Sequence, residues 1–153
     1  MRRIGASMWC FLACFSLFAA SATPARAQQV RAGVQGGVSV DPDQGFIGGH
    51  VETSPLVDRV RFRPGVDIGF GDDVTLVGIN LEFTYAFTAN RPWHIYAGGG
   101  PAINWFNYDN DSEAEAGFNF LVGAKNRDGL FFEMKIGAMD SPDLRFVVGY
   151  TFR

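Results

Sequence analysis

From residue 28 onward, large apolar residues alternate with small or polar ones, and turn-forming residues interrupt the alternation at short intervals. This period of two is typical of a strand whose two faces meet different surroundings. No segment of this part of the chain shows helical periodicity, so the pattern predicts an all-β domain. The expected strands are 30–40, 46–53, 59–70, 74–87, 93–107, 114–125, 130–138 and 144–152.

The connections between these segments are short and rich in Gly, Pro, Asn, Asp and Ser, which suit tight turns. They contain the sequences DPDQG, SPLVD, GDD, TANRP, YDNDSE, NRDG and MDSPD. Because short connections join antiparallel neighbours, the expected topology is an up-and-down meander. Eight such strands hide their edges by closing into a barrel, in which the last strand pairs with the first.

The two faces of these strands differ in size as well as polarity. One face is aromatic and aliphatic, with Phe83, Trp105 and Phe120 among its members, whereas the other is dominated by glycine and polar residues. The interior of an eight-stranded barrel is only just wide enough to be filled by side chains, so a face crowded with aromatic residues is hard to fit inside. We therefore expect the apolar face to lie outside, against lipid. The segment lengths agree with the roughly 9–11 residues of a tilted membrane strand, so the sequence predicts an eight-stranded antiparallel transmembrane β-barrel.

The first 27 residues have the pattern of a cleaved secretory signal peptide. Arg2 and Arg3 precede an apolar stretch from residue 4 to about residue 20, and Ala25-Arg26-Ala27 offers a small-x-small cleavage site. Cleavage after Ala27 leaves residues 28–153 as one barrel domain. Both cysteines, at positions 10 and 14, lie within the segment that is removed. The remaining chain therefore has no disulfide, thiol nucleophile or thiolate metal site.

Net charge excludes one class of partner. Loss of three arginines with the signal peptide lowers Lys+Arg from 13 to 10 against 16 acids, which moves the formal charge from −3 to about −6. A phosphate-binding face needs clustered cations and a basic balance, so nucleic acid is not an expected partner.

The C-terminal segment DLRFVVGYTFR carries large apolar residues at alternate positions and has an aromatic residue, Phe152, next to its end. This segment resembles the closing strand of small bacterial outer-membrane β-barrels, although here Arg153 follows the aromatic residue. The resemblance implies a porin-like barrel in the outer membrane of a Gram-negative cell envelope, recognised by the barrel-assembly machinery through this strand. It also implies contact with outer-membrane lipid and lipopolysaccharide, and we expect a monomer.

Charged residues on the inward face are expected to form an interlocking network that plugs the lumen. We expect Glu82 to lie near Arg61 and Arg63 once the hairpin about GDD folds. The predicted members are Arg61, Arg63, Asp67, Glu82, Glu115, Lys125, Glu133, Lys135 and Arg145.

Candidates for catalysis are few, and we expect no catalytic residue, cofactor or firm metal site. Some barrels of this size resemble lipid A deacylases, which carry a His-x-Ser pair near the C-terminus; the comparable stretch here has Ser141 but no histidine, and a nucleophile without a base is inert. His50, Glu52 and His94 are interpreted as polar lumen residues. The favoured function is a non-enzymatic barrel that contributes to envelope integrity or surface interaction. A lipid A-modifying enzyme and a secreted lipocalin-like ligand-binding barrel remain as alternatives.

Acidic residues gather in the connections at the end of the barrel opposite to the termini. Asp72, Asp73, Asp109, Asp111 and Glu113 are weak candidates for binding divalent cations, which prefer oxygen ligands. The alternative is that these carboxylates merely keep turns solvated.

Overall fold

The computed structural model describes residues 29–71, 75–87, 92–108 and 111–153, and the expected signal peptide lies outside these residues. The described chain forms eight strands and no helix, and it has no helical segment long and apolar enough to cross a membrane. The strands are β1 (Arg31–Val40), β2 (Gln44–Glu52), β3 (Val60–Phe70), β4 (Thr75–Ala86), β5 (Trp93–Tyr108), β6 (Asp111–Asn126), β7 (Leu130–Met139) and β8 (Leu144–Thr151).

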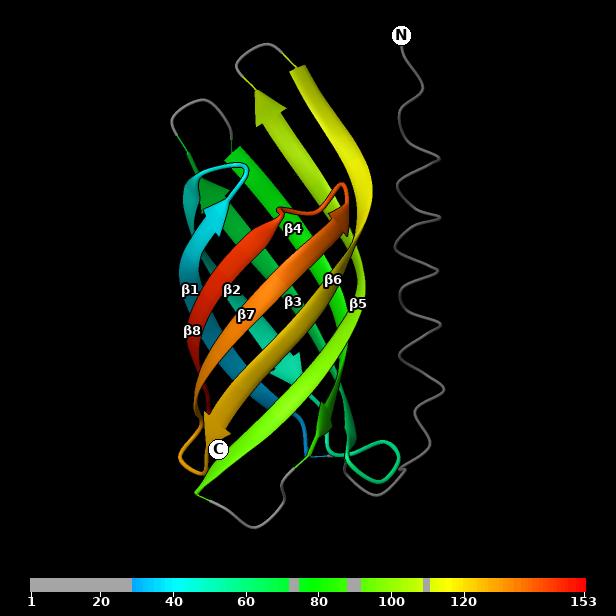
Figure 1. Ribbon diagram of the computed structural model, residues 1–153, viewed down its shortest axis with the longest axis vertical. Coiled ribbons are helices and arrows are strands. Elements are labelled where there is room, and N and C mark those ends of the chain that lie inside the picture. The colour runs from blue at the N-terminus through cyan, green and yellow to red at the C-terminus, as the bar shows by residue number, and fades with distance from the viewer. Residues whose placement is uncertain (1–28, 72–74, 88–91, 109–110) are drawn as a thin grey trace, which may run out of the picture.

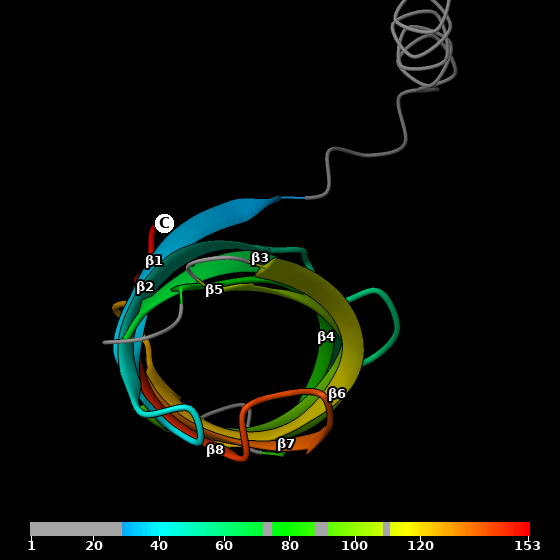
Figure 2. The same cartoon turned by 90° about the horizontal axis from the view of Figure 1, so that it is seen from above.

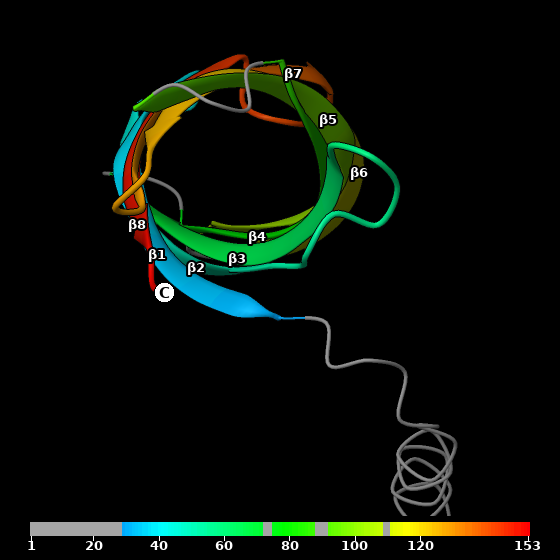
Figure 3. The same ribbon diagram turned by 90° about the horizontal axis from the view of Figure 1, so that it is seen from below.

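The eight strands form a closed antiparallel barrel in sequence order, which confirms the predicted meander (Figure 1). Each strand pairs with its neighbours in the chain, and β8 closes the sheet by pairing with β1 from Gly33↔Thr151 to Val40↔Leu144. Views along the barrel axis show a single continuous wall with the strands tilted around it (Figures 2 and 3). Closure leaves no unpaired sheet edge among the described strands.

Strand boundaries differ from the sequence prediction mainly at β6. The β5–β6 ladder extends to Tyr108↔Asp111, so residues 111–113 belong to a strand and not to a loop. All three residues are polar, so this stretch shows no alternation of apolar and polar positions. The sequence pattern therefore placed the start of the strand later. Both strands of this hairpin are therefore longer than the sequence indicated.

Burial in this barrel is inverted relative to a globular protein. The exposed large residues are apolar and include Ile47, Phe83 and Phe120, whereas Asn80, Glu82 and Lys135 are at most 2% exposed. The face sorting predicted from the sequence is confirmed for Phe83 and Phe120 outside and for Asn80, Glu82 and Lys135 inside. Apolar side chains cover the outside of the wall, and polar side chains fill the inside.

Three aromatic rings are exceptions, because Phe46, Tyr96 and Phe131 are buried on the inward face. Each ring faces a glycine directly across a ladder: Phe46↔Gly37, Tyr96↔Gly123 and Phe131↔Gly149. A Cβ atom at Gly149 would lie 2.3 Å from the Phe131 ring, and one at Gly123 would lie 2.5 Å from the Tyr96 hydroxyl. The glycines therefore make room for the large inward side chains that the narrow interior would otherwise exclude.

Gly149→Ala should destabilise the barrel by about 1–3 kcal/mol, the usual range for overpacking a full interior. The new methyl group would meet the Phe131 ring and also the Val34 carbonyl oxygen, 2.6 Å away. Gly45→Ala is the matched control, because its Cβ would meet nothing closer than 3.9 Å. Urea unfolding of both variants checks this, and equal midpoints would contradict the close approach at Gly149.

Candidate functional site

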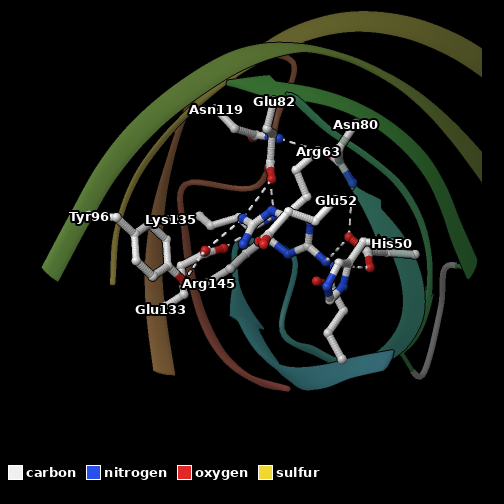
Figure 4. A network of polar contacts seen from close by, with 12 residues as sticks. His50, Glu52, Arg63, Asn80, Glu82, Tyr96, Asn119, Glu133, Lys135 and Arg145 are labelled. Atoms are coloured by element: carbon white, nitrogen blue, oxygen red, sulfur yellow. Dashed lines mark hydrogen bonds and ion pairs between the residues drawn. The ribbon is translucent and has the colours of Figure 1, made fainter. Parts of the chain in front are cut away.

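Four charged side chains form a cluster in the centre of the lumen, which we call the central cluster: Arg63, Glu82, Glu133 and Lys135 (Figure 4). Arg63 on β3 bonds Glu82 at 2.9 Å and Glu133 at 2.6 Å. Lys135 on β7 bonds the same two carboxylates at 2.5 and 3.5 Å. Two cations thus alternate with two anions, and the cluster has no net formal charge.

The central cluster crosses the lumen from one wall to the other. Strands β3 and β7 are not neighbours but lie on opposite sides of the closed sheet, so the Arg63–Glu133 pair spans the interior. Tyr96 on β5 adds a third direction, since its hydroxyl donates a hydrogen bond to Glu133 at 2.8 Å. All four charged residues are 5% exposed or less. Such charges are tolerated in a buried position only because each one has partners.

A second layer of polar contacts lies around Asp67 on β3, nearer the end opposite to the chain termini. Arg145 pairs with this carboxylate at 3.0 Å, and Gln35 and Asn80 donate to its two oxygens at 2.6 and 2.9 Å. Asn119 extends the chain of contacts by donating to Asn80 at 2.8 Å. The carboxylate is therefore bonded directly from three strands, β1, β4 and β8, and Asn80 connects it to β6.

The third group of contacts lies at the end of the barrel where β1 begins and β8 ends, which we call the termini end. Glu52 accepts from Arg61 at 3.1 Å through one oxygen and from Lys125 at 2.8 Å through the other. Deeper in the lumen, His50 Nε2 lies 3.0 Å from the Thr151 hydroxyl. Here two cations share one carboxylate, so this group carries a net positive charge.

The predicted partner of Arg61 is wrong, although the residue does face the lumen. Arg63, not Arg61, stands directly across from Glu82 in the β3–β4 ladder, and Arg61 stands across from Thr84. Arg61 lies one inward position nearer the termini end and binds Glu52 on the other side of β3. Glu115 also differs from the prediction, since it forms no ion pair with any described residue.

The lumen contains groups that the sequence analysis did not assign to a network. Alternation along the strands puts Glu52, Asn80 and Asn119 on the inward face but gives them no partners, because it specifies a face and not a depth. Tyr96 was missed, although it lies two residues from both His94 and Gly98 in the segment HIYAGGG and so shares their face of the strand. The alternation along that strand could have located it.

Ser141, His50 and His94, the candidates for catalysis and metal binding, lie on different elements of the described barrel. Ser141 is buried and its hydroxyl lies 3.3 Å from the Asn104 amide, with no histidine among its described contacts. His50 and His94 lie on separate strands, β2 and β5. The described part of the chain holds no group of three His, Cys, Asp or Glu residues that could bind a metal.

Only two of the five predicted cation-binding residues lie among the described residues. Asp72, Asp73 and Asp109 lie outside the described residues, and the Asp111 and Glu113 backbones lie in β6. The Glu113 side chain is exposed. Cation binding at this end therefore remains a prediction.

Comparisons with known proteins support the fold alone. No protein-family model matches the chain, and no curated protein sequence matches it. Among solved structures, the chain is similar to the N-terminal β-barrel domain of Pseudomonas aeruginosa OprF, with a TM-score of 0.60 and 17% sequence identity. The match covers 80% of this chain and 96% of that one. The protein therefore shares the class of eight-stranded antiparallel barrels with the OprF domain.

Glu82→Gln should destabilise the barrel by about 3–5 kcal/mol, because it leaves Arg63 and Lys135 short of one anion in a buried site. Asp128→Asn is the matched control. Its carboxylate lies 3.5 Å from Arg153, but the two side chains are 78% and 62% exposed. Exposed pairs contribute at most about 1 kcal/mol. Chemical unfolding in detergent measures both values, and a loss for Glu82→Gln no larger than that of the control would contradict the buried network.

Proposed function

We propose that the protein is a non-enzymatic integral barrel of a Gram-negative outer membrane, whose lumen is closed by its charge network. The observation that carries the proposal is the inverted burial: the exposed wall is apolar, while charged side chains occupy the interior. A barrel in water would gain from the opposite arrangement, since exposed apolar surface favours association. Hydrocarbon, in contrast, accepts this outer surface and excludes the charged one.

Aromatic residues at the ends of the wall support a membrane setting. Trp93, Tyr85 and Tyr150 lie near the termini end, and Trp105 and Phe70 lie near the opposite end of their strands. Several of these rings contact another ring, as in the Tyr85–Phe87 pair with centroids 5.4 Å apart. Amphipathic rings are favoured at the level of lipid headgroups, so two such belts would fix the height of the barrel in the bilayer.

The arrangement of the lumen favours a structural protein over a pore. The central cluster connects β3, β4, β5 and β7 through direct contacts, and the Asp67 layer connects β1, β3, β4 and β8. Two successive cross-lumen layers leave little continuous path for water or ions. The proposed role is therefore contact with lipid and lipopolysaccharide and support of the envelope, with insertion through the β8 strand.

Cell fractionation combined with gel migration tests this proposal. The protein should appear in the outer-membrane fraction and should migrate differently before and after heating in detergent, because a closed barrel resists unfolding by detergent alone. Recovery in the soluble periplasmic fraction would contradict the proposal and would favour a secreted ligand-binding barrel. Mass spectrometry of lipid A with and without the gene should show no difference, whereas a lost acyl chain would assign an enzymatic function.

Planar-bilayer recording tests the closed lumen. The purified protein should show no ohmic conductance steps, because the central cluster and the Asp67 layer cross the passage. A variant with Arg63→Ser, Glu82→Ser, Glu133→Ser and Lys135→Ser removes both signs of charge together and so leaves no uncompensated ion. This variant should conduct, provided that it retains the heat-dependent migration of a folded barrel. Steady conductance by the unaltered protein would contradict the plug.

A further inference from the structure

A cavity of about 340 Å³ opens into the lumen at the termini end. It is lined by the first or last residues of β1 to β6 and β8, and its inner part reaches Arg63 and Tyr96 of the central cluster. The cavity therefore lies between the barrel rim and the charge network. Its size is at the lower limit of the roughly 300–1,000 Å³ of ligand pockets, which suits a small solute.

The composition of the cavity wall is strongly cationic. Seven of the nine Lys and Arg residues in the described chain line it, and the other two, Lys135 and Arg145, lie deeper in the lumen. The seven are Arg31, Arg59, Arg61, Arg63, Lys125, Arg127 and Arg153. Glu52 is the one acidic side chain in the lining.

Protein carboxylates neutralise only part of this charge. Arg63 belongs to the neutral central cluster, Arg153 has the exposed Asp128, and Arg61 and Lys125 share Glu52. Arg31, Arg59 and Arg127 form no ion pair with any described residue. The lining thus holds an excess of about four positive charges once its ion pairs are counted.

Arg31 shows that the excess positive charge does not come only from fully exposed side chains. It stands directly across from Glu52 in the β1–β2 ladder and is only partly exposed, yet both Glu52 oxygens are taken by Arg61 and Lys125. Like charges gathered around one carboxylate in a partly enclosed space repel one another. An anion bound among them would relieve this repulsion.

We propose that this cavity binds a small solute with two adjacent anionic groups, a diphosphate being the best match. Guanidinium groups bind phosphate oxygens through paired, planar hydrogen bonds, and most cations of the lining are arginines. Two phosphate groups balance the excess charge better than a single phosphate does. The central cluster closes the inner side of the cavity, so the solute binds from the termini end and does not pass through. This site goes beyond the proposed function and rests on the lining of the cavity.

Isothermal titration of the barrel, purified from membranes in dodecylmaltoside, tests the site with inorganic pyrophosphate as the probe. Pyrophosphate should bind saturably at one site per barrel and at least about tenfold more tightly than inorganic phosphate at matched ionic strength. Arg31→Gln should weaken binding about tenfold, the factor that corresponds to the loss of one charge-assisted hydrogen bond. The affinity of Arg31→Lys for pyrophosphate should lie between those of the unaltered protein and Arg31→Gln. Lysine retains the charge of Arg31 but loses its paired hydrogen-bond geometry.

Asn107→Asp is the matched control, since it makes the same change in net charge on an exposed residue near the opposite end of the barrel. Binding by this variant should equal that of the unaltered protein. Equal weakening by Arg31→Gln and Asn107→Asp, or heat that never saturates, would overturn the site. If Arg31→Gln does not fold, Arg127→Gln in the exposed β6–β7 turn takes its place with the same expectation.

Phosphatidylglycerol added to the micelles identifies the source of the phosphate. Displacement of pyrophosphate by this lipid would support the phosphate site and assign it to a lipid headgroup, whereas unchanged binding supports a soluble diphosphate. Heat-dependent migration of the same sample shows independently whether the barrel is intact. Failure of pyrophosphate binding in an intact, membrane-derived barrel would therefore overturn this site and leave the proposed function standing.

Discussion

The narrow interior of an eight-stranded barrel is the constraint on which the rest of this structure depends. The inside admits side chains but no second layer of secondary structure, so every inward position must be small or must interlock with the opposite wall. Glycines face the three inward rings, and Arg63 reaches Glu133 across the whole lumen. Bulky apolar residues are consequently displaced to the outside, where they cover the wall. A polar core and an apolar surface are two results of the same restriction on space.

Buried ion pairs in such a core contribute more to specificity than to stability. Replacing a buried pair by apolar residues of similar volume is often neutral, whereas removing one partner is costly. A slip of one residue in the β3–β4 register would turn Arg63 outward and break its contact with Glu82, its direct cross-strand partner. The network thus favours a single register around the closed sheet. Its layers differ in charge: the central cluster and the Asp67–Arg145 pair are neutral, while the groups at the termini end are cationic. The neutral central cluster and the cationic termini end are therefore distinct regions of the lumen that meet at Arg63.

Much of the fold follows from the sequence because period-two alternation records directly which face each residue occupies. Strand number, order, closure and the inward position of residues such as Asp67 and Lys135 could all be predicted in this way. Depth and pairing could not, because alternation specifies neither the register of adjacent strands nor the contacts across the lumen. Arg61 was accordingly expected near Glu82 on β4, whereas it binds Glu52 on β2. The cationic cavity was missed for a related reason. Arg31, Arg59 and Arg127 are far apart in the sequence and come together only when the barrel closes. The early start of β6 escaped prediction since residues 111–113 lack apolar members.

In the proposed arrangement the apolar wall of the barrel faces lipid and the polar face is sealed inside. The chain from residue 28 has no cysteine, so single cysteines placed along β6 can carry nitroxide labels without background. Collision rates with oxygen, which partitions into lipid, and with a water-soluble nickel complex should be measured for labels at positions 119 to 122 in liposomes. The account predicts that labels at 120 and 122 collide readily with oxygen and rarely with nickel, while those at 119 and 121 are hidden from both. Preferential collision with nickel at positions 120 and 122 would contradict it, because the apolar wall would then face water.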